Sequence, residues 1–254
     1  MNENVLESNY TDTLGRGKVL VKKDSENNWL DLCSVESFNV TVTTETLDKI
    51  SLRSGIKRIQ KSVTVSQNIE GNFVISDTNI ENLKLFFMAG DEVDASQTTG
   101  TLVAEEVTVN YNRWTKISKE NLDAVVTVKD KATGLITYVE NTDYILDRKA
   151  GLIAPIEGGD ITDNEELTID CDYAARTITR ISGGAVTSQK RHLWFVGDPA
   201  EGVIQHYKCY ANIFPSGDLA AIGDEWQQFT CNFKTEVHSA YPNGYIEYED
   251  HGKR

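Results

Sequence analysis

The sequence predicts a mainly β protein, because apolar and polar residues alternate along most of its length. Over residues 166–174, one face of an extended chain carries four apolar side chains, Leu167, Ile169, Cys171 and Tyr173. The same period of two returns at residues 38–42, 63–65, 107–111, 126–128 and 229–233. Strands with one apolar and one polar face are typical of antiparallel sheets that cover a core.

Two domains are expected from the order of these strands. Residues 105–176 contain short strands at regular spacing, near 106–111, 124–129, 135–139, 144–146, 152–154 and 166–174, which is typical of a small immunoglobulin-like β-sandwich. A polar linker precedes this segment. We therefore expect a discontinuous β domain, residues 1–104 and 177–254, that carries an inserted domain, residues 105–176.

The discontinuous domain begins with expected strands at 15–23, 29–33 and 38–43, and resumes with strands at 191–196, 203–211, 227–235 and 245–249. A turn is expected at 214–218. Residues 79–89 form the one expected helix, with Thr78 and Glu81 as a capping box and Gly90 as its left-handed C-terminal cap. The side chains predicted to pack on the sheet are Ile80, Leu83, Phe86 and Phe87.

Residues 44–62 are polar and basic and centre on the turn signal at residues 54–55. This composition predicts an extended hairpin that reaches away from its own core. It would expose four cations, Arg53, Lys57, Arg58 and Lys61. The segment is either a solvated loop or an arm that docks on an acidic neighbour, and the sequence leaves both interpretations open.

The formal net charge is -14, and the apolar share of 39% fits a globular fold. An acidic surface disfavours tight binding of nucleic acid, which depends on Lys and Arg. No apolar segment approaches about 20 residues, and the start of the chain lacks the features of a signal peptide. We expect no membrane contact, and a protein made and used without crossing a membrane by itself.

No catalytic constellation, metal site or cofactor site is expected. The four histidines, His192, His206, His238 and His251, lack the short spacings typical of metal ligands, and there is no nucleophile motif or nucleotide fingerprint. The cysteines are expected to be buried free thiols. Cys209 and Cys231, however, would bridge if oxidised should they lie opposite each other on neighbouring strands.

Tryptophans are the remaining candidates for binding, because many carbohydrate-binding sandwiches stack sugar rings on exposed aromatic side chains. Trp194 lies in an apolar run and is expected in the core. Trp114 lies on a polar stretch and is the candidate for binding a glycan.

The order of features resembles that of major tail tube proteins of tailed bacteriophages. These features are the glycine-led first strand, the basic hairpin, the strand and capped helix of residues 73–90, Phe195-Val-Gly-Asp-Pro199, and the acidic turn 223–226. The resemblance implies a tail-tube-type β-sandwich or barrel with one flanking helix. It also implies a structural virion protein, made in the host cytoplasm, whose hexameric rings stack into the tube through which the genome is ejected.

The resemblance further implies partners and positions. The chain would bind copies of itself and other phage tail proteins, and viral DNA would pass through without specific binding. The hairpin cations would meet an adjacent ring, Glu36 and Glu45 are candidates for lining an acidic bore, and the inserted domain would face outward. The rival interpretations are a non-enzymatic glycan-binding adhesin and a hydrolase on a sandwich scaffold.

Overall fold

The computed structural model describes residues 12–53 and 55–253, and it confirms the mainly β class. Strands hold 53% of the chain, and the single helix of the described residues holds 3%. The chain divides into two compact units. The sheet unit contains the residues through Asp91 and those from Ile181 onward, and the inserted unit is Glu92–Arg180.

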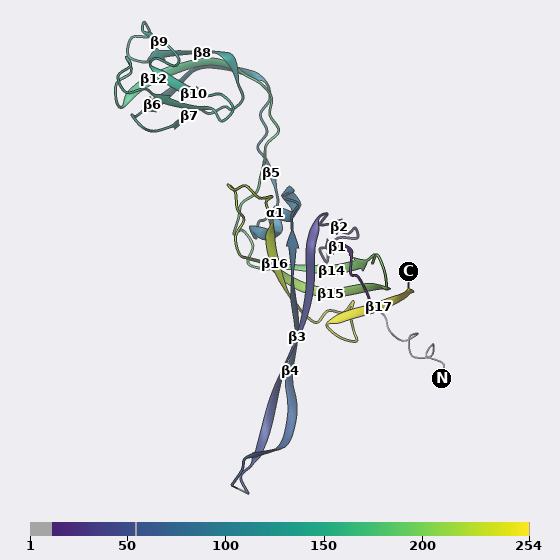
Figure 1. Cartoon of the computed structure of the whole chain (residues 1–254). Coiled ribbons are helices and arrows are strands. Elements are labelled where there is room, and N and C mark those ends of the chain that lie inside the picture. The colour runs from purple at the N-terminus through teal and green to yellow at the C-terminus, as the bar shows by residue number, and fades with distance from the viewer. Residues whose placement is uncertain (1–11, 54, 254) are drawn as a thin grey trace. The chain divides into compact units, whose positions relative to one another are not determined.

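The sheet unit is built on one antiparallel sheet of eight strands. Its order is β2 (Leu30–Asp31), β1 (Gly17–Lys22), β14 (Gln189–Gly197), β15 (Val203–Ser216), β16 (Phe229–Thr235), β4 (Arg58–Ile75) and β3 (Val35–Ser51). The eighth strand, β17 (Ile246–Lys253), pairs with the first half of β15, whereas β16 takes the second half. β3 is therefore the last strand at one end of the sheet (Figure 1).

One face of this sheet forms the core of the unit. Alternate residues of β14, β15, β16 and β4 point into it, and Phe73, Leu193, Ile213 and Phe233 are fully buried there. Trp194 follows Leu193 on β14 and therefore lies on the opposite face, where its ring packs edge-on against Trp29 at 5.3 Å. The expectation that Trp194 is a core residue was wrong, since the alternation of a strand overrides the apolar character of the run.

The helix α1 (Ile80–Phe86) covers part of this core, although its caps differ from the prediction. Asn79, not Thr78, is the N-cap, and its side chain accepts a hydrogen bond from the Asn82 amide. At the other end, Met88 takes the left-handed conformation (φ 51°) and the Ala89 amide bonds to the Lys84 carbonyl. The helix thus ends in a Schellman motif two residues before Gly90.

The expected packing stripe of α1 is confirmed for Leu83 and Phe86, which are partly buried against the core, but the rest of the buried face differs. Leu85 is the buried apolar residue of the helix, whereas Phe87 is 43% exposed. Asn82 is fully buried, and its amide donates hydrogen bonds to the carbonyls of Leu32 and Asp77. A polar side chain therefore fastens α1 to the chain around it.

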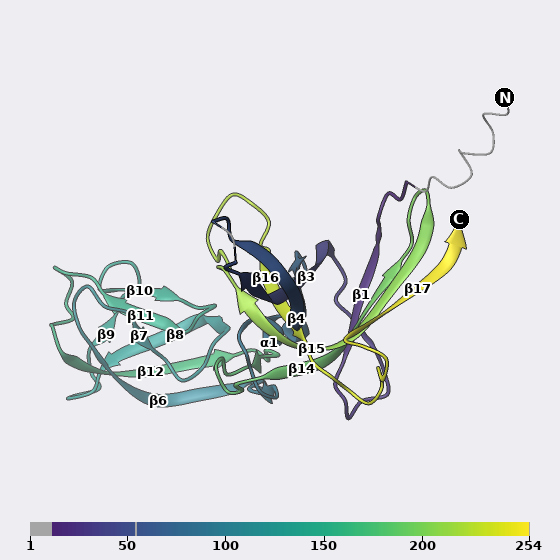
Figure 2. The same ribbon diagram turned by 90° about the horizontal axis from the view of Figure 1, so that it is seen from below.

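The inserted unit is a sandwich of two antiparallel sheets, seen as two layers in Figure 2. One sheet has the order β6 (Gly100–Val109), β12 (Glu165–Tyr173), β8 (Leu122–Asp130) and β9 (Thr137–Tyr138). The other has the order β10 (Tyr144–Asp147), β11 (Leu152–Pro155) and β7 (Thr115–Lys116). Side chains from both sheets share one core, which includes Val109, Val128, Ile153, Leu167 and Ile169.

The boundaries of this unit differ from the predicted 105–176. The predicted start falls inside β6, whose alternation is interrupted where Ala104 takes a positive φ of 49°. Before the sandwich the chain forms β5 (Val93–Asp94), and after it β13 (Thr179–Arg180), and these two strands pair with each other. The chain thus enters and leaves the inserted unit on adjacent antiparallel strands.

The expected turn at 214–218 is also displaced. β15 continues through Pro215, which faces Cys231 of β16, and the turn begins at Gly217 (φ 79°). Proline is tolerated there because β14 pairs with β15 only as far as Ile213, so that no strand lies beside Pro215 on its other edge.

Candidate functional site

The long hairpin of β3 and β4 is an exposed feature of the sheet unit. The two strands pair along the whole hairpin, from Val35 opposite Ile75 to Ser51 opposite Arg58, and the register shifts at three irregularities. Beyond the sheet they have no other strand beside them, and they project as a two-stranded arm (Figure 1). The extended hairpin expected over residues 44–62 is therefore present, and it is longer than predicted.

Exposed apolar side chains lie along this arm and in the connection between its strands. The exposed fractions are 69% for Leu47, 75% for Leu52, 68% for Ile56 and 63% for Ile59. A two-stranded hairpin is marginally stable in water, and contiguous exposed apolar surface is typical of interaction sites. The arm is thus a candidate interaction surface.

The four predicted cations all lie at the exposed end of the arm. Arg53 and Lys57 are in the connection, Arg58 begins β4, and Lys61 lies further along β4. Among the residues that the structure describes, none of these four side chains forms an ion pair. The sequence argument missed Lys49, which lies directly opposite Lys61. Like charges at directly opposed positions repel, so an acidic partner surface would stabilise this pair.

The outer edge of β3 is a second feature of the site. In the described structure β3 pairs only with β4, so a row of backbone N–H and C=O groups along Val35–Ser51 faces away from the sheet. Natural edge strands often contain a proline that prevents further pairing, and this strand has none. A long open edge of this kind is suited to adding a strand from another chain.

The face of the sheet opposite the core is polar near β3. Asn39, Asn72 and Asn232 lie side by side across β3, β4 and β16, and the Asn39 amide donates a 2.9 Å hydrogen bond to the Asn72 side chain. The next row contains Thr41, Glu70, Lys234 and Asn212. We call these two rows the polar face.

The two bore-lining candidates do not lie together. Glu36 occupies an irregularity at the start of β3 and accepts a 2.8 Å hydrogen bond from Ser76, whereas Glu45 is in the arm and accepts one of 3.2 Å from Ser66. Nine residues of extended chain separate them, a distance of about 30 Å. They form no joint carboxylate site.

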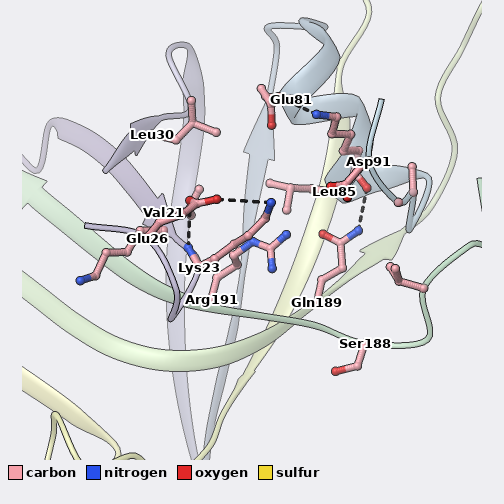
Figure 3. A pocket seen from close by; sticks show the side chains of 15 residues that line it. Val21, Lys23, Glu26, Leu30, Glu81, Leu85, Asp91, Ser188, Gln189 and Arg191 are labelled. Atoms are coloured by element: carbon pink, nitrogen blue, oxygen red, sulfur yellow. Dashed lines mark hydrogen bonds and ion pairs between the residues drawn. The ribbon is translucent and has the colours of Figure 1, made fainter. Parts of the chain in front are cut away.

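A pocket of about 270 Å³ lies beside α1, between β1 and the start of β14 (Figure 3). Lys23 pairs with Glu26 and Lys84 with Glu81, so these carboxylates on its wall already have cations. Arg191 points into the same space. Its side chain donates to the Lys190 carbonyl at 3.0 Å, and burial lowers the pKa of Arg191.

The pocket also contains an acceptor without a donor. Gln189 is 2% exposed and its amide nitrogen donates to the Lys84 carbonyl at 2.7 Å, but its Oε1 is buried without a hydrogen-bond partner. The pocket thus has a guanidinium in its lining and a buried carbonyl oxygen without a partner in its wall. No sequence motif marks it, because its residues come from distant segments.

Trp114 lies in the connection between β6 and β7 and is 51% exposed. A second tryptophan is more exposed: Trp226, in the acidic turn before β16, is 94% exposed, and Ile222 beside it is 97% exposed. The sequence argument did not single out these two residues as a binding surface.

The cysteines do not form the bridge that the sequence left open. Cys231 lies opposite Pro215 on β15, six residues along that strand from Cys209, so the two thiols are about 20 Å apart along the chain direction. Cys33, Cys171, Cys209 and Cys231 are all free, but the expected burial was wrong for Cys33, which is exposed. Burial raises the pKa of Cys209 and of Cys231 to about 12, which keeps both thiols protonated and unreactive.

The fold gathers the four histidines into two clusters, each with one carboxylate. His192 and His238 meet at Asp24, and His206 and His251 meet at Glu249. In each cluster the potential ligand atoms lie within 4.8 Å of one another. Strand pairing brings these residues together from distant segments, so their spacing in the sequence gave no signal beyond the alternation of Glu249 and His251.

Among the described residues, the structure has no helix that is long and apolar enough to cross a membrane. A family model described as "Protein of unknown function UCP028589" matches residues 12–245. No curated protein matches the chain.

Proposed function

The chain belongs to the family of that description, and we propose that it is a self-assembling structural subunit, the tail tube protein of a tailed bacteriophage. In this proposal the subunits form hexameric rings, and the rings stack into a tube through which DNA passes. The single observation that carries the proposal is the open edge of β3 continued into an exposed arm.

The open edge supports assembly into rings. An edge strand of 17 residues is long compared with the five or six residues of a typical strand. Pairing with a second chain would satisfy its outward backbone groups, and β17 offers another edge, since it pairs only with β15 in the described structure. Two different edges on one subunit give a head-to-tail contact, which closes into a ring when the rotation per subunit permits.

The arm supports stacking of one ring on the next. Its apolar side chains are exposed within the subunit, and burying one Leu or Ile fully contributes about 1.5–3 kcal/mol. Its five cations, Lys49, Arg53, Lys57, Arg58 and Lys61, match a chain whose formal net charge is -14. The arm of one copy would therefore find an acidic surface on another copy.

The polar face supports a bore that does not hold DNA. If the sheet closes into a barrel, the core face is covered by the subunit itself and the polar face is the one left for the lumen. It consists mainly of amide and hydroxyl groups, with Glu70 opposite Lys234. Such a lining has few cations to bind phosphates and would let a duplex slide.

The test is assembly of the purified full chain, followed by negative-stain electron microscopy and analytical ultracentrifugation over a range of concentrations. Hollow tubes or hexameric rings are expected. A chain that stays monomeric at every concentration contradicts the proposal. A chain that stays monomeric and is retarded on a glycan column supports the adhesin interpretation instead, if the Trp114→Ala variant is no longer retarded.

A pair of variants connects assembly to the edge of β3. Val42 is 55% exposed on β3, and Val125 is 76% exposed in the inserted unit. A lysine on an edge strand opposes pairing with another chain. Val42→Lys is expected to block ring formation without unfolding the subunit, whereas the matched control Val125→Lys is expected to assemble as the unmodified chain does.

A further inference from the structure

We propose that His206, Glu249 and His251 bind a divalent transition-metal ion of the zinc class. His206 is on β15, and its direct cross-strand partner on β17 is Glu249. His251 follows two residues later along β17. The hydrogen-bonded pairing of β15 and β17 thus holds three potential ligands at one place, independently of the assembly proposed above (Figure 2 shows the two strands side by side).

The distances suit such an ion. Glu249 Oε2 lies 3.1 Å from His251 Nε2 and 3.8 Å from His206 Nδ1. Zinc binds imidazole nitrogen and carboxylate oxygen at about 2.0–2.2 Å, so neighbouring ligand atoms of a tetrahedral site are about 3.3–3.6 Å apart. The two observed separations lie on either side of that range. Small side-chain adjustments would complete three corners and leave the fourth for water.

An unsatisfied nitrogen points to a missing ligand. His206 Nδ1 is buried and has no hydrogen-bond partner in the described structure, because 3.8 Å from Glu249 is too long for a hydrogen bond. Leaving a buried polar atom unpaired is unfavourable. A metal ion between the three side chains would satisfy it.

The surrounding groups support this assignment. The other carboxylate oxygen of Glu249 accepts a 2.7 Å hydrogen bond from Lys208, whose ammonium also lies over the Trp194 ring at 4.8 Å. Glu249 Oε2 is hydrogen-bonded to His251 Nε2 at 3.1 Å, and a bound ion would replace this contact.

The other histidine cluster lacks this signature and serves as a contrast. The Ala240 amide donates to His238 Nδ1 at 3.1 Å, which leaves the proton of the neutral ring on Nε2, the atom that faces Asp24 at 3.3 Å. Both ring nitrogens of His192 also have partners, Tyr241 at 3.1 Å and Asp24 at 3.0 Å. That cluster is satisfied by hydrogen bonds alone.

The test is titration of the full chain, freed of metal by chelation, with Co²⁺ as the probe. Visible d–d absorption reports bound Co²⁺, and Zn²⁺ should displace it. His251→Ala removes an exposed ligand and is expected to weaken Co²⁺ binding by at least about tenfold. His238→Ala, in the contrasting cluster, is the matched control and is expected to bind as the unmodified chain does.

Circular dichroism and urea unfolding in the presence of chelator establish that both variants are folded. His251→Asn provides a second variant with a polar side chain at the same exposed position. Loss of binding in the His251 variants with retention in His238→Ala supports the site. Any other pattern, including no Co²⁺ binding by the unmodified chain, overturns it.

Discussion

Reversing the charge of the arm is the perturbation that separates assembly from folding. We consider the triple variant Arg53→Glu, Lys57→Glu and Arg58→Glu. All three side chains are exposed, and within the described structure none of them forms an ion pair. Exposed substitutions of this kind change the free energy of unfolding by about 0.5 kcal/mol or less each. The isolated subunit should therefore unfold at nearly the same urea concentration as the unmodified chain.

The effect on assembly is expected to be much larger. An exposed ion pair contributes about 0.2–1 kcal/mol, and reversal replaces each attraction with a similar repulsion, or about 1 kcal/mol for each of the three sites. A loss of about 3 kcal/mol per contact corresponds to a roughly hundredfold rise in the concentration needed for tubes. The difference should shrink in high salt, because salt screens exposed charges.

The assay is sedimentation of polymer as a function of protein concentration, with electron microscopy of the pellets and urea unfolding of the subunit. The matched control is Arg113→Glu, Lys149→Glu and Arg180→Glu, three exposed cations of the inserted unit. This control changes the net charge by the same amount. If the arm variant forms tubes at the unmodified concentration, or the control fails equally, the reasoning about the arm is refuted.

Three further outcomes are expected. Gly71→Ala should destabilise the sheet unit by about 1–3 kcal/mol in urea unfolding, because the added Cβ would lie 2.0 Å from the Asn39 carbonyl oxygen. The control Gly55→Ala, whose added Cβ has nothing within 4 Å, should be as stable as the unmodified chain. Backbone hydrogen bonds to Asp143 lower the pKa of its carboxyl, so the stabilisation by this carboxylate is present above the ordinary carboxyl pKa of about 3.9 and is lost as the pH falls through the lower folded value. Asp143→Asn should therefore unfold more easily than the unmodified chain at pH 7, as followed by circular dichroism. Equal stability of the two proteins at pH 7 would contradict this. Replacing Glu92–Arg180 with a short flexible linker should leave the sheet unit folded and tubes thinner but intact in micrographs, and an unfolded product would contradict the independence of the units.

The sequence predicted what depends on local period and little of what depends on register. Alternation placed Leu167 and Ile169 in the core and identified the strands around them. It placed the cap at Thr78, one residue before the observed cap Asn79, because both residue types are common N-caps. It also misplaced Trp194, since an apolar run hides which of its members face the core.

Sites made by pairing between distant strands were the least predictable. The separation of Cys209 from Cys231 depends on the register of β15 with β16. The meeting of His206 with Glu249 depends on the register of β15 with β17. The placement of Lys49 opposite Lys61 depends on an irregularity between Lys49 and Ile50 that shifts the register of β3 with β4 by one residue. The pattern of residues in a single sequence does not show the register in which distant strands pair.

The pairing of β5 with β13 has a consequence for how the chain can vary. Because both crossings between the units lie on neighbouring strands, a foreign domain with closely spaced termini can be exchanged for Glu92–Arg180 by joining it at two adjacent points. Evolution can thus replace the insert without redesigning the sheet, and the same two junctions can be used to attach an enzyme or an epitope to the chain.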